Sequence, residues 1–163
     1  MLKDLLISHP TPENMHIIPT SRDPITQLAL SSRNAYLSPS ELEVAPVLYR
    51  ALSAAKDQFD NSAILTDGDG QVTGEDLIST ATATILHQQS RLDTPDKNFG
   101  IDVGAGGDNV RVRLELDYIE VFDRDTFQPI RGPVGFDQKL VIAGAVWVGQ
   151  TRLIDNLLLG WDM

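Results

Sequence analysis

The feature that most constrains the fold is an abrupt change of hydrophobic pattern in the second half of the chain. Residues 110–117 read VRVRLELD, so that apolar and charged residues alternate strictly. Such alternation is typical of a half-buried strand, which here extends towards Val121, because successive side chains of a strand point to opposite faces. Residues 140–149, LVIAGAVWVG, are almost continuously apolar and predict a central strand.

Helical signals come before these strands. Ser38 is a candidate N-cap, Pro39 follows it at the first helical position, and Glu41 completes a capping box. Pro46 lacks an amide proton and clashes with the preceding helical turn. We therefore expect a short helix that breaks near Ala45 and a second helix that begins at Pro46.

The second helix is expected to end near Phe59, and a third helix follows Thr73, its predicted N-cap. Helical spacing gives each an apolar face: Leu48, Ala51, Leu52 and Ala55 in the second, and Ile78, Ala81, Thr82, Ile85 and Gln89 in the third. The turn-rich residues 60–74 and the glycine-rich residues 91–109 are expected to be irregular, and residues 15–20, MHIIPT, to form a buried strand. Helices followed by paired strands predict an α+β fold, a small antiparallel β-sheet covered by helices.

Charge and composition exclude several classes of function. The chain has 13 Lys and Arg against 23 Asp and Glu, a net charge of −10, so its field repels nucleic acids and anionic membranes. It has no cysteine, which removes disulfides, thiolate metal sites and cysteine nucleophiles. Its N-terminus does not resemble a signal peptide, and no window approaches the roughly 18 apolar residues of a membrane span. We expect a cytoplasmic protein with no nucleic-acid or membrane partner.

No metal site is predicted. In DGDGQVTGED, Asp67, Asp69 and Gly70 fit a calcium-binding loop, but Leu65 and Asp76 occupy positions that require other ligands. The glycine-rich stretch at residues 104–109 precedes a strand instead of opening a helix, which argues against a nucleotide-binding turn. The histidines do not form a metal pair, and we interpret three acids as solvated or bonded within local turns. These residues are His9, His16 and His87, and Asp117, Glu120 and Asp155.

A polar cluster, Ser31 to Asn34, lies just before the capped helix. It offers two hydroxyls, a guanidinium, a carboxamide and backbone N–H groups, a set that suits a phosphate held locally against the unfavourable net charge. The same residues are also common in ordinary loops. From these residues alone, a phosphate site and a plain polar loop both remain open.

The longer string over residues 19–52, PTSRDPITQLALSSRNAYLSPSELEVAPVLYRAL, resembles the pantothenate synthetase (pantoate-beta-alanine ligase) family. Members carry P-T-x-R-E/D, a short insert, L-A-M-S-S-R-N-x-Y-L-S-P-E-E and A-P-x-L-Y-x-A-L. Residues 116–130, LDYIEVFDRDTFQPI, and 151–156, TRLIDN, also resemble family blocks. Leu30 stands where methionine is frequent, and Gln27 replaces a glycine. Residues 60–108 match poorly and are interpreted as an insertion of a eukaryotic, fungal-like variant.

The resemblance implies a C-terminal part of the enzyme. Residues 1–34 would end the nucleotide-binding domain, contributing the last strand of its Rossmann-like sheet and the phosphate-binding loop, and residues 35–163 would form the lid domain. The family's H-x-G-H motif lies upstream in members and does not occur in this chain. ATP with Mg²⁺ would be bound mainly by that upstream domain.

The reaction implied by the resemblance joins pantoate and β-alanine through a pantoyl adenylate, releasing pyrophosphate and then AMP, and the parent enzyme would be a homodimer. Arg33 would be catalytic, stabilising charge on the departing pyrophosphate beside Ser31 and Ser32. Leu30 and the backbone near Ser21 would contact the adenine side of ATP. We expect the chain by itself to be inactive. The alternative is a non-catalytic binding module with the same lid fold, which a natural start at Met1 would favour.

Overall fold

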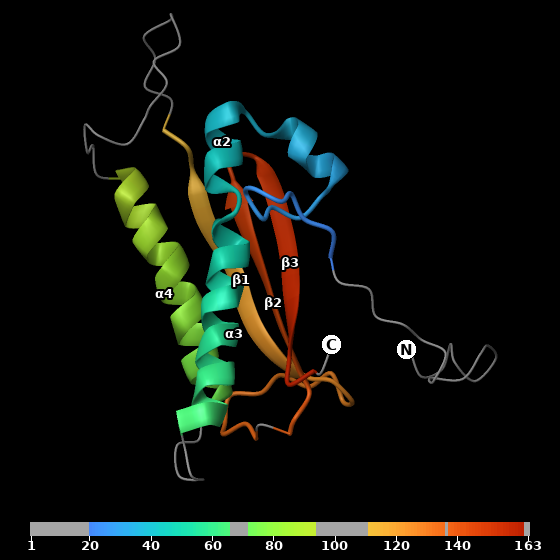
Figure 1. The fold of residues 1–163 in the computed structure, drawn as a ribbon. Coiled ribbons are helices and arrows are strands. Elements are labelled where there is room, and N and C mark those ends of the chain that lie inside the picture. The colour runs from blue at the N-terminus through green and yellow to red at the C-terminus, as the bar shows by residue number, and fades with distance from the viewer. Residues whose placement is uncertain (1–19, 66–71, 94–110, 136, 162–163) are drawn as a thin grey trace, which may run out of the picture.

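The computed structural model describes residues 20–65, 72–93, 111–135 and 137–161. Its elements are η2 (Ser32–Tyr36), a 3-10 helix, the helices α2 (Pro39–Val44), α3 (Val47–Leu65) and α4 (Gly74–Asp93), and the strands β1 (Leu114–Asp123), β2 (Leu140–Val148) and β3 (Thr151–Leu159). Strand β2 lies between β1 and β3 and is antiparallel to both. The helices α3 and α4 pack together against one face of this sheet (Figure 1). The predicted α+β fold is confirmed.

The start of α2 matches the predicted capping box. The Ser38 hydroxyl accepts a hydrogen bond from the Glu41 amide at 3.3 Å, and the Glu41 carboxylate accepts one from the Ser38 amide at 2.8 Å. Pro39 occupies the first turn, where its missing amide proton has no partner to lose. The predicted break at Ala45 is confirmed, and α3 begins one residue after Pro46.

Helix α3 is longer than predicted. Its expected apolar face is buried, but its predicted end near Phe59 was wrong, since the helix continues to Leu65. Two of the polar residues that suggested a turn have hydrogen-bond partners within the helix. Asp60 accepts from Lys56 one turn earlier at 2.7 Å, and the Ser62 hydroxyl donates to the Gln58 carbonyl at 2.6 Å.

Helix α4 starts at the predicted cap. The Thr73 hydroxyl accepts from the Asp76 amide at 3.0 Å, and the Asp76 carboxylate accepts from the Thr73 amide and hydroxyl at 2.9 and 2.6 Å. These bonds lower the pKa of Asp76, the Thr73 hydroxyl contributing most. Of the predicted face, Ile78, Ala81 and Ile85 are buried, and Thr82 and Gln89 are half-buried; Leu77, not part of that face, is fully buried.

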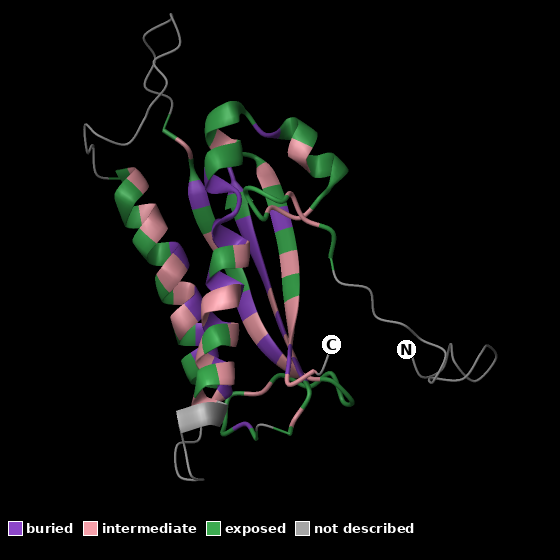
Figure 2. Cartoon of the chain, viewed as in Figure 1, coloured by how far each residue is buried: buried purple, intermediate pink, exposed green. Residues whose placement is uncertain are grey.

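The alternating pattern from residue 110 predicted an earlier start for the first strand. Among the described residues, strand β1 begins at Leu114. Its pairing with β2 shifts between Leu116 and Tyr118, a bulge that reverses the alternation. Ile119 and Val121 therefore face the helices. The buried residues lie mainly along α3, α4 and the three strands, whereas α2 and η2 are mostly exposed (Figure 2).

Strand β3 was not predicted from the sequence. The strand predicted over residues 15–20 falls, except for Thr20, outside the described residues, as do the predicted calcium-like turn at residues 67–70 and the glycine-rich stretch at 104–109. Within the part of the chain that is described, no helix combines the length and apolar content needed to cross a membrane.

Candidate functional site

A short hairpin loop, residues 21–30, leads into the polar cluster. Arg22 and Ala29 form an isolated antiparallel bridge, and the Leu30 amide donates to the Ser21 carbonyl at 2.9 Å. The two residues expected on the adenine side, Ser21 and Leu30, are therefore neighbours across this hairpin. The side chain of Leu30 is not packed in the core, since the residue is 63% exposed.

The tip of the hairpin loop is organised by Asp23. One carboxylate oxygen of Asp23 accepts from the amides of Ile25 and Thr26 and from the Thr26 hydroxyl, at 3.0, 2.7 and 2.9 Å. The Thr26 amide contributes most to the lowered pKa of Asp23, followed by the Thr26 hydroxyl. Gln27 adopts φ 64°, a region that glycine enters without steric cost. The glycine that the resemblance places at the position of Gln27 would adopt this conformation without that cost.

The polar cluster forms the exposed 3-10 turn η2. The Ser31 hydroxyl caps it by accepting from the Arg33 amide at 3.2 Å. Ser31, Ser32 and Arg33 are exposed together, as a phosphate site requires. Asn34 has an internal role, since its amide nitrogen donates to the Ala29 carbonyl at 2.9 Å and ties η2 to the hairpin loop.

Arg33 makes no ion pair with an acid of the described segments. By contrast, Arg22, Arg113, Arg131 and Arg152 each pair with a carboxylate there. A paired guanidinium has part of its charge and its donors already satisfied, whereas that of Arg33 faces solvent. Arg33 is accordingly suited to bind an anion.

A small pocket lies beside the cluster. Its volume is about 60 Å³, and it is lined by residues of the hairpin loop, η2 and its cap, the junction of α2 and α3, α3 and β3: Leu28, Ala29, Ser31, Arg33, Asn34, Ala45, Leu48, Tyr49, Leu153, Ile154 and Asp155. The side-chain oxygen of Asn34 is buried and has no hydrogen-bond partner among the described residues. Sites for small-molecule ligands usually measure about 300–1,000 Å³, so this pocket has room for water but not for a nucleotide.

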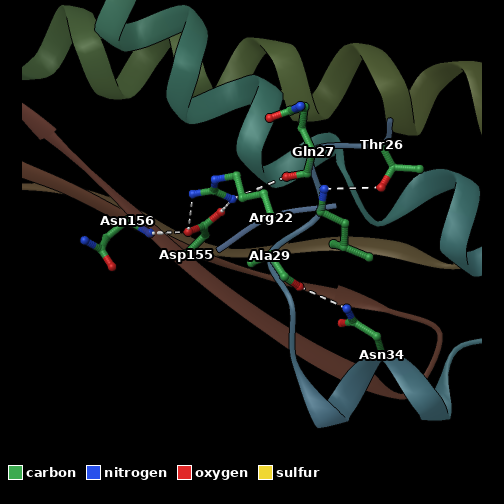
Figure 3. Close-up of polar contacts among 8 residues, drawn as sticks. Arg22, Thr26, Gln27, Ala29, Asn34, Asp155 and Asn156 are labelled. Atoms are coloured by element: carbon green, nitrogen blue, oxygen red, sulfur yellow. Dashed lines mark hydrogen bonds and ion pairs between the residues drawn. The ribbon is translucent and has the colours of Figure 1, made fainter. Parts of the chain in front are cut away.

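At the wall of the pocket, Asp155 forms a bidentate ion pair with Arg22 (Figure 3). The two N–O distances are 2.6 and 3.0 Å, and the Arg22 guanidinium stacks 3.9 Å from the centre of the Tyr49 ring. The interpretation of Asp155 as solvated was wrong, since its side chain is only 7% exposed; besides a local bond from the Asn156 amide, it has a partner 133 positions away. Tyr49 and Asp155 were not among the predicted site residues.

The other two acids are also ion-paired. Asp117 accepts from Arg152 at 2.8 Å, and Glu120 accepts from Arg131 at the same distance. Asp117 is exposed, in agreement with the solvated interpretation, whereas Glu120 is half-buried; their partners lie 35 and 11 positions away, so these ion pairs are not local turn bonds. Within the described segments, no group of three or more His, Asp or Glu side chains could hold a metal ion. His87 is exposed there, and His9 and His16 lie outside the described residues.

Comparison with known proteins identifies similar sequences and structures. The family model described as pantoate-beta-alanine ligase matches residues 1–158. The chain is 34% identical over 142 residues to a pantothenate synthetase of Thermotoga neapolitana, covering 87% of this chain and 38% of that protein. It is 36% identical over 132 residues to a bifunctional pantoate ligase/cytidylate kinase of Synechocystis, covering 81% of this chain and 20% of that protein.

The fold is likewise similar to a solved structure. The crystal structure of pantothenate synthetase from Thermus thermophilus superposes with a TM-score of 0.59 and 26% sequence identity, covering 96% of this chain and 42% of that one. The chain thus spans well under half the length of the relatives it matches. The helix-covered three-stranded sheet is a fold that these proteins share.

Proposed function

The chain belongs to the pantoate-beta-alanine ligase family, and we propose that it forms the part of a pantothenate synthetase that closes over ATP and contacts its phosphates. In this reaction a pantoate carboxylate oxygen attacks the α-phosphate of ATP, giving pantoyl adenylate and pyrophosphate. The amine of β-alanine then displaces AMP and forms pantothenate. The observation that carries the proposal is the family match over residues 1–158.

The geometry of η2 supports the assignment of residues. Negative charge accumulates on the departing pyrophosphate, and a guanidinium with nearby hydroxyls stabilises that charge without transferring a proton. Arg33 would do so as the catalytic residue, with Ser31 and Ser32 as further donors. Leu30 and the backbone at Ser21 would contact the adenine side, because the hairpin loop holds them next to each other.

The rest of the nucleotide would be bound outside this chain. The pocket beside η2 is far smaller than a nucleotide, and the described residues offer no metal-binding group of acids. ATP with Mg²⁺ would be bound mainly by the upstream nucleotide-binding domain that the resemblance implies. The domain boundary would fall near Asn34, and an insertion over residues 60–108 would include the core helix α4. Within this proposal the enzyme is a cytoplasmic homodimer that binds neither nucleic acid nor membranes.

The test is pantoate-dependent exchange of labelled pyrophosphate into ATP, measured on the complete protein that carries this chain. Exchange should require pantoate and proceed without β-alanine, since the adenylate forms first. Pantothenate and AMP should then accumulate in equal amounts when β-alanine is added. A complete protein that exchanges pyrophosphate with another carboxylic acid, and not with pantoate, would refute the assignment of substrate.

A further inference from the structure

We propose that Arg22 and Asp155 are positioning residues whose ion pair fixes the hairpin loop on β3 and thereby sets the location of Ser31, Ser32 and Arg33. The link to the reaction rests on the function proposed above. The ion pair joins two sequence blocks, PTSRD and TRLIDN, that lie at opposite ends of the described chain.

Three elements hold the Arg22 guanidinium. Both terminal nitrogens bind the Asp155 carboxylate of β3, one of them also points at the Gln27 carbonyl at 3.4 Å, and the Tyr49 ring of α3 covers its face. The side chains of Arg22 and Asp155 are only 11% and 7% exposed. A bidentate pair of this kind fixes orientation as well as distance, because the planar guanidinium matches the carboxylate in one geometry.

The position of Asp155 in β3 explains why it needs this partner. It lies between Leu153 and Leu157 in the alternation of β3 and pairs across the sheet with Gly144. A Cβ atom on Gly144 would lie 2.5 Å from a methyl group of Ile119, which shows how closely the core is packed there. An unpaired carboxylate at this edge of the core would be unfavourable, so Asp155 and Arg22 depend on each other.

A short series of backbone and side-chain hydrogen bonds connects this ion pair to the polar cluster. The backbone of Arg22 is bridged to Ala29, the Ala29 carbonyl accepts from the Asn34 side chain, and Arg33 precedes Asn34 (Figure 3). Arg22 itself is not a phosphate ligand, since its charge is balanced by Asp155. Its contribution is to hold the segment from which Arg33 projects.

Hydrogen exchange of the 163-residue chain tests the structural half. Asp155→Asn keeps the shape of the side chain but removes its charge, and Arg22→Lys keeps the charge but removes the planar fork. Both should accelerate exchange of the Gln27 and Leu30 amides by roughly tenfold or more, while the Leu77 amide of α4 changes less than about twofold. Asp117→Asn is the matched control, because it removes an exposed ion pair with Arg152 and should leave the hairpin loop unchanged.

Kinetic measurements on the complete protein test the functional part of the proposal, that the ion pair positions Arg33 for the reaction. Asp155→Asn should lower kcat for pyrophosphate release roughly 10- to 100-fold, because small displacements of a catalytic group are costly, and Arg22→Lys should retain more activity. Unchanged exchange in the hairpin loop, acceleration spread evenly over the chain, or an unchanged kcat would each overturn the proposal. If the unsubstituted complete protein has no ligase activity, the proposed function fails, and the exchange result still decides whether the ion pair fixes the loop.

Discussion

Arg33 is exposed and makes no ion pair among the described residues, so its replacement should affect the reaction more than the fold. Arg33→Ala in the complete protein should raise the barrier to adenylate formation by about 2 to 4 kcal/mol, since it removes stabilisation of charge that develops in the transition state. Single-turnover measurement of pyrophosphate release would quantify the loss.

Two further variants make this measurement specific. Arg33→Lys should restore only part of the rate, because an ammonium lacks the planar fork that binds two phosphate oxygens. Arg113→Ala is the matched control, since Arg113 is also an exposed arginine but is paired with a carboxylate, that of Glu115. A normal rate with Arg33→Ala would remove Arg33 from the mechanism.

Also at the scale of single residues, the structure differs most from the sequence-based prediction at Asp155. The cluster Ser31 to Arg33 could be singled out as a candidate because its members are adjacent and polar, and the family resemblance favoured it over a plain loop. Asp155 stands in TRLIDNLLLG with no local sign of its role, and its partner is 133 residues earlier. Only the pairing of β3 with β2 brings its carboxylate to the face on which the hairpin loop lies. Residue type and local spacing carry no information about such a contact.

At the scale of elements, one turn structure occurs twice. Asp123 repeats the bonds of Asp23: its carboxylate oxygen accepts from the amides of Asp125 and Thr126 and from the Thr126 hydroxyl, at 3.0, 2.8 and 2.9 Å. The residue after each threonine has a positive φ, 64° at Gln27 and 54° at Phe127. Both turns share the pattern Asp-x-x-Thr. In each, the aspartate carboxylate accepts hydrogen bonds from backbone amides that the tight turn leaves without a backbone partner.

This repeated turn predicts how stability depends on pH. The Thr126 amide, followed by the Thr126 hydroxyl, lowers the pKa of Asp123, as the corresponding groups of Thr26 do for Asp23. A carboxyl whose pKa is lower in the folded state binds protons more weakly there, so its stabilisation is present above its unfolded pKa of about 3.9 and is lost as the pH falls through the folded value.

The free energy of unfolding should therefore decrease on acidification below about pH 4, measured by urea titration at several pH values. The double variant Asp23→Asn, Asp123→Asn keeps an accepting oxygen at each turn but does not titrate, so its decrease should be smaller. Asp125→Asn is the control, because Asp125 accepts no turn hydrogen bond within the described residues. An equal acid response in all three proteins would contradict the role of the turns.

The β2–β3 hairpin and the start of α2 depend on each other at Gly149. Gly149 has φ 58°, and a Cβ atom there would lie 1.7 Å from a carboxylate oxygen of Glu41, the residue that completes the capping box. Gly149→Ala should lower the free energy of unfolding by on the order of 1 to 3 kcal/mol, because alanine is strained in the left-handed backbone conformation and its Cβ atom would displace the cap.

Chemical denaturation would measure this loss in the free energy of unfolding. A double variant would separate the contribution of the left-handed backbone from that of the displaced cap. Ser38→Ala already weakens the cap, so adding it to Gly149→Ala should cost less than the sum of the single effects. Gly132→Ala serves as the control, since a Cβ atom there meets nothing within 4 Å. Full additivity would show that Glu41 and the hairpin turn are independent.

Element boundaries show what local signals could and could not predict. The caps at Ser38 and Thr73 depend on residues three positions apart, and both were predicted. The end of α3 was not, because Asp60 and Ser62 resemble turn residues until their partners one helical turn earlier are known. Strand β3 has one charged and one amide residue in its centre, which obscured its alternation; its pairing with β2 decides its structure.

At the scale of the whole molecule, the described residues build a core of their own. Side chains from α3, α4 and all three strands are completely buried together, among them Leu52, Leu77, Ile85, Leu140, Ile142 and Leu159. A domain of this size buries enough apolar surface to fold independently. The proposed site differs from the core, because η2 and the small pocket would present only one side of a nucleotide-binding surface.

The 163-residue chain should accordingly fold but neither bind ATP tightly nor catalyse ligation. Arg33 and the neighbouring hydroxyls offer a few charge-assisted hydrogen bonds, each worth about 1.5 to 3 kcal/mol, against an association cost of about 4 to 15 kcal/mol. The net charge of −10 adds long-range repulsion of the triphosphate. We expect a Kd of about 1 mM or weaker in a calorimetric titration with Mg²⁺–ATP, while near-ultraviolet circular dichroism should show a cooperative thermal transition. Micromolar binding by this chain, or pantothenate formed from its substrates, would mean that residues 1–163 contain the complete active site.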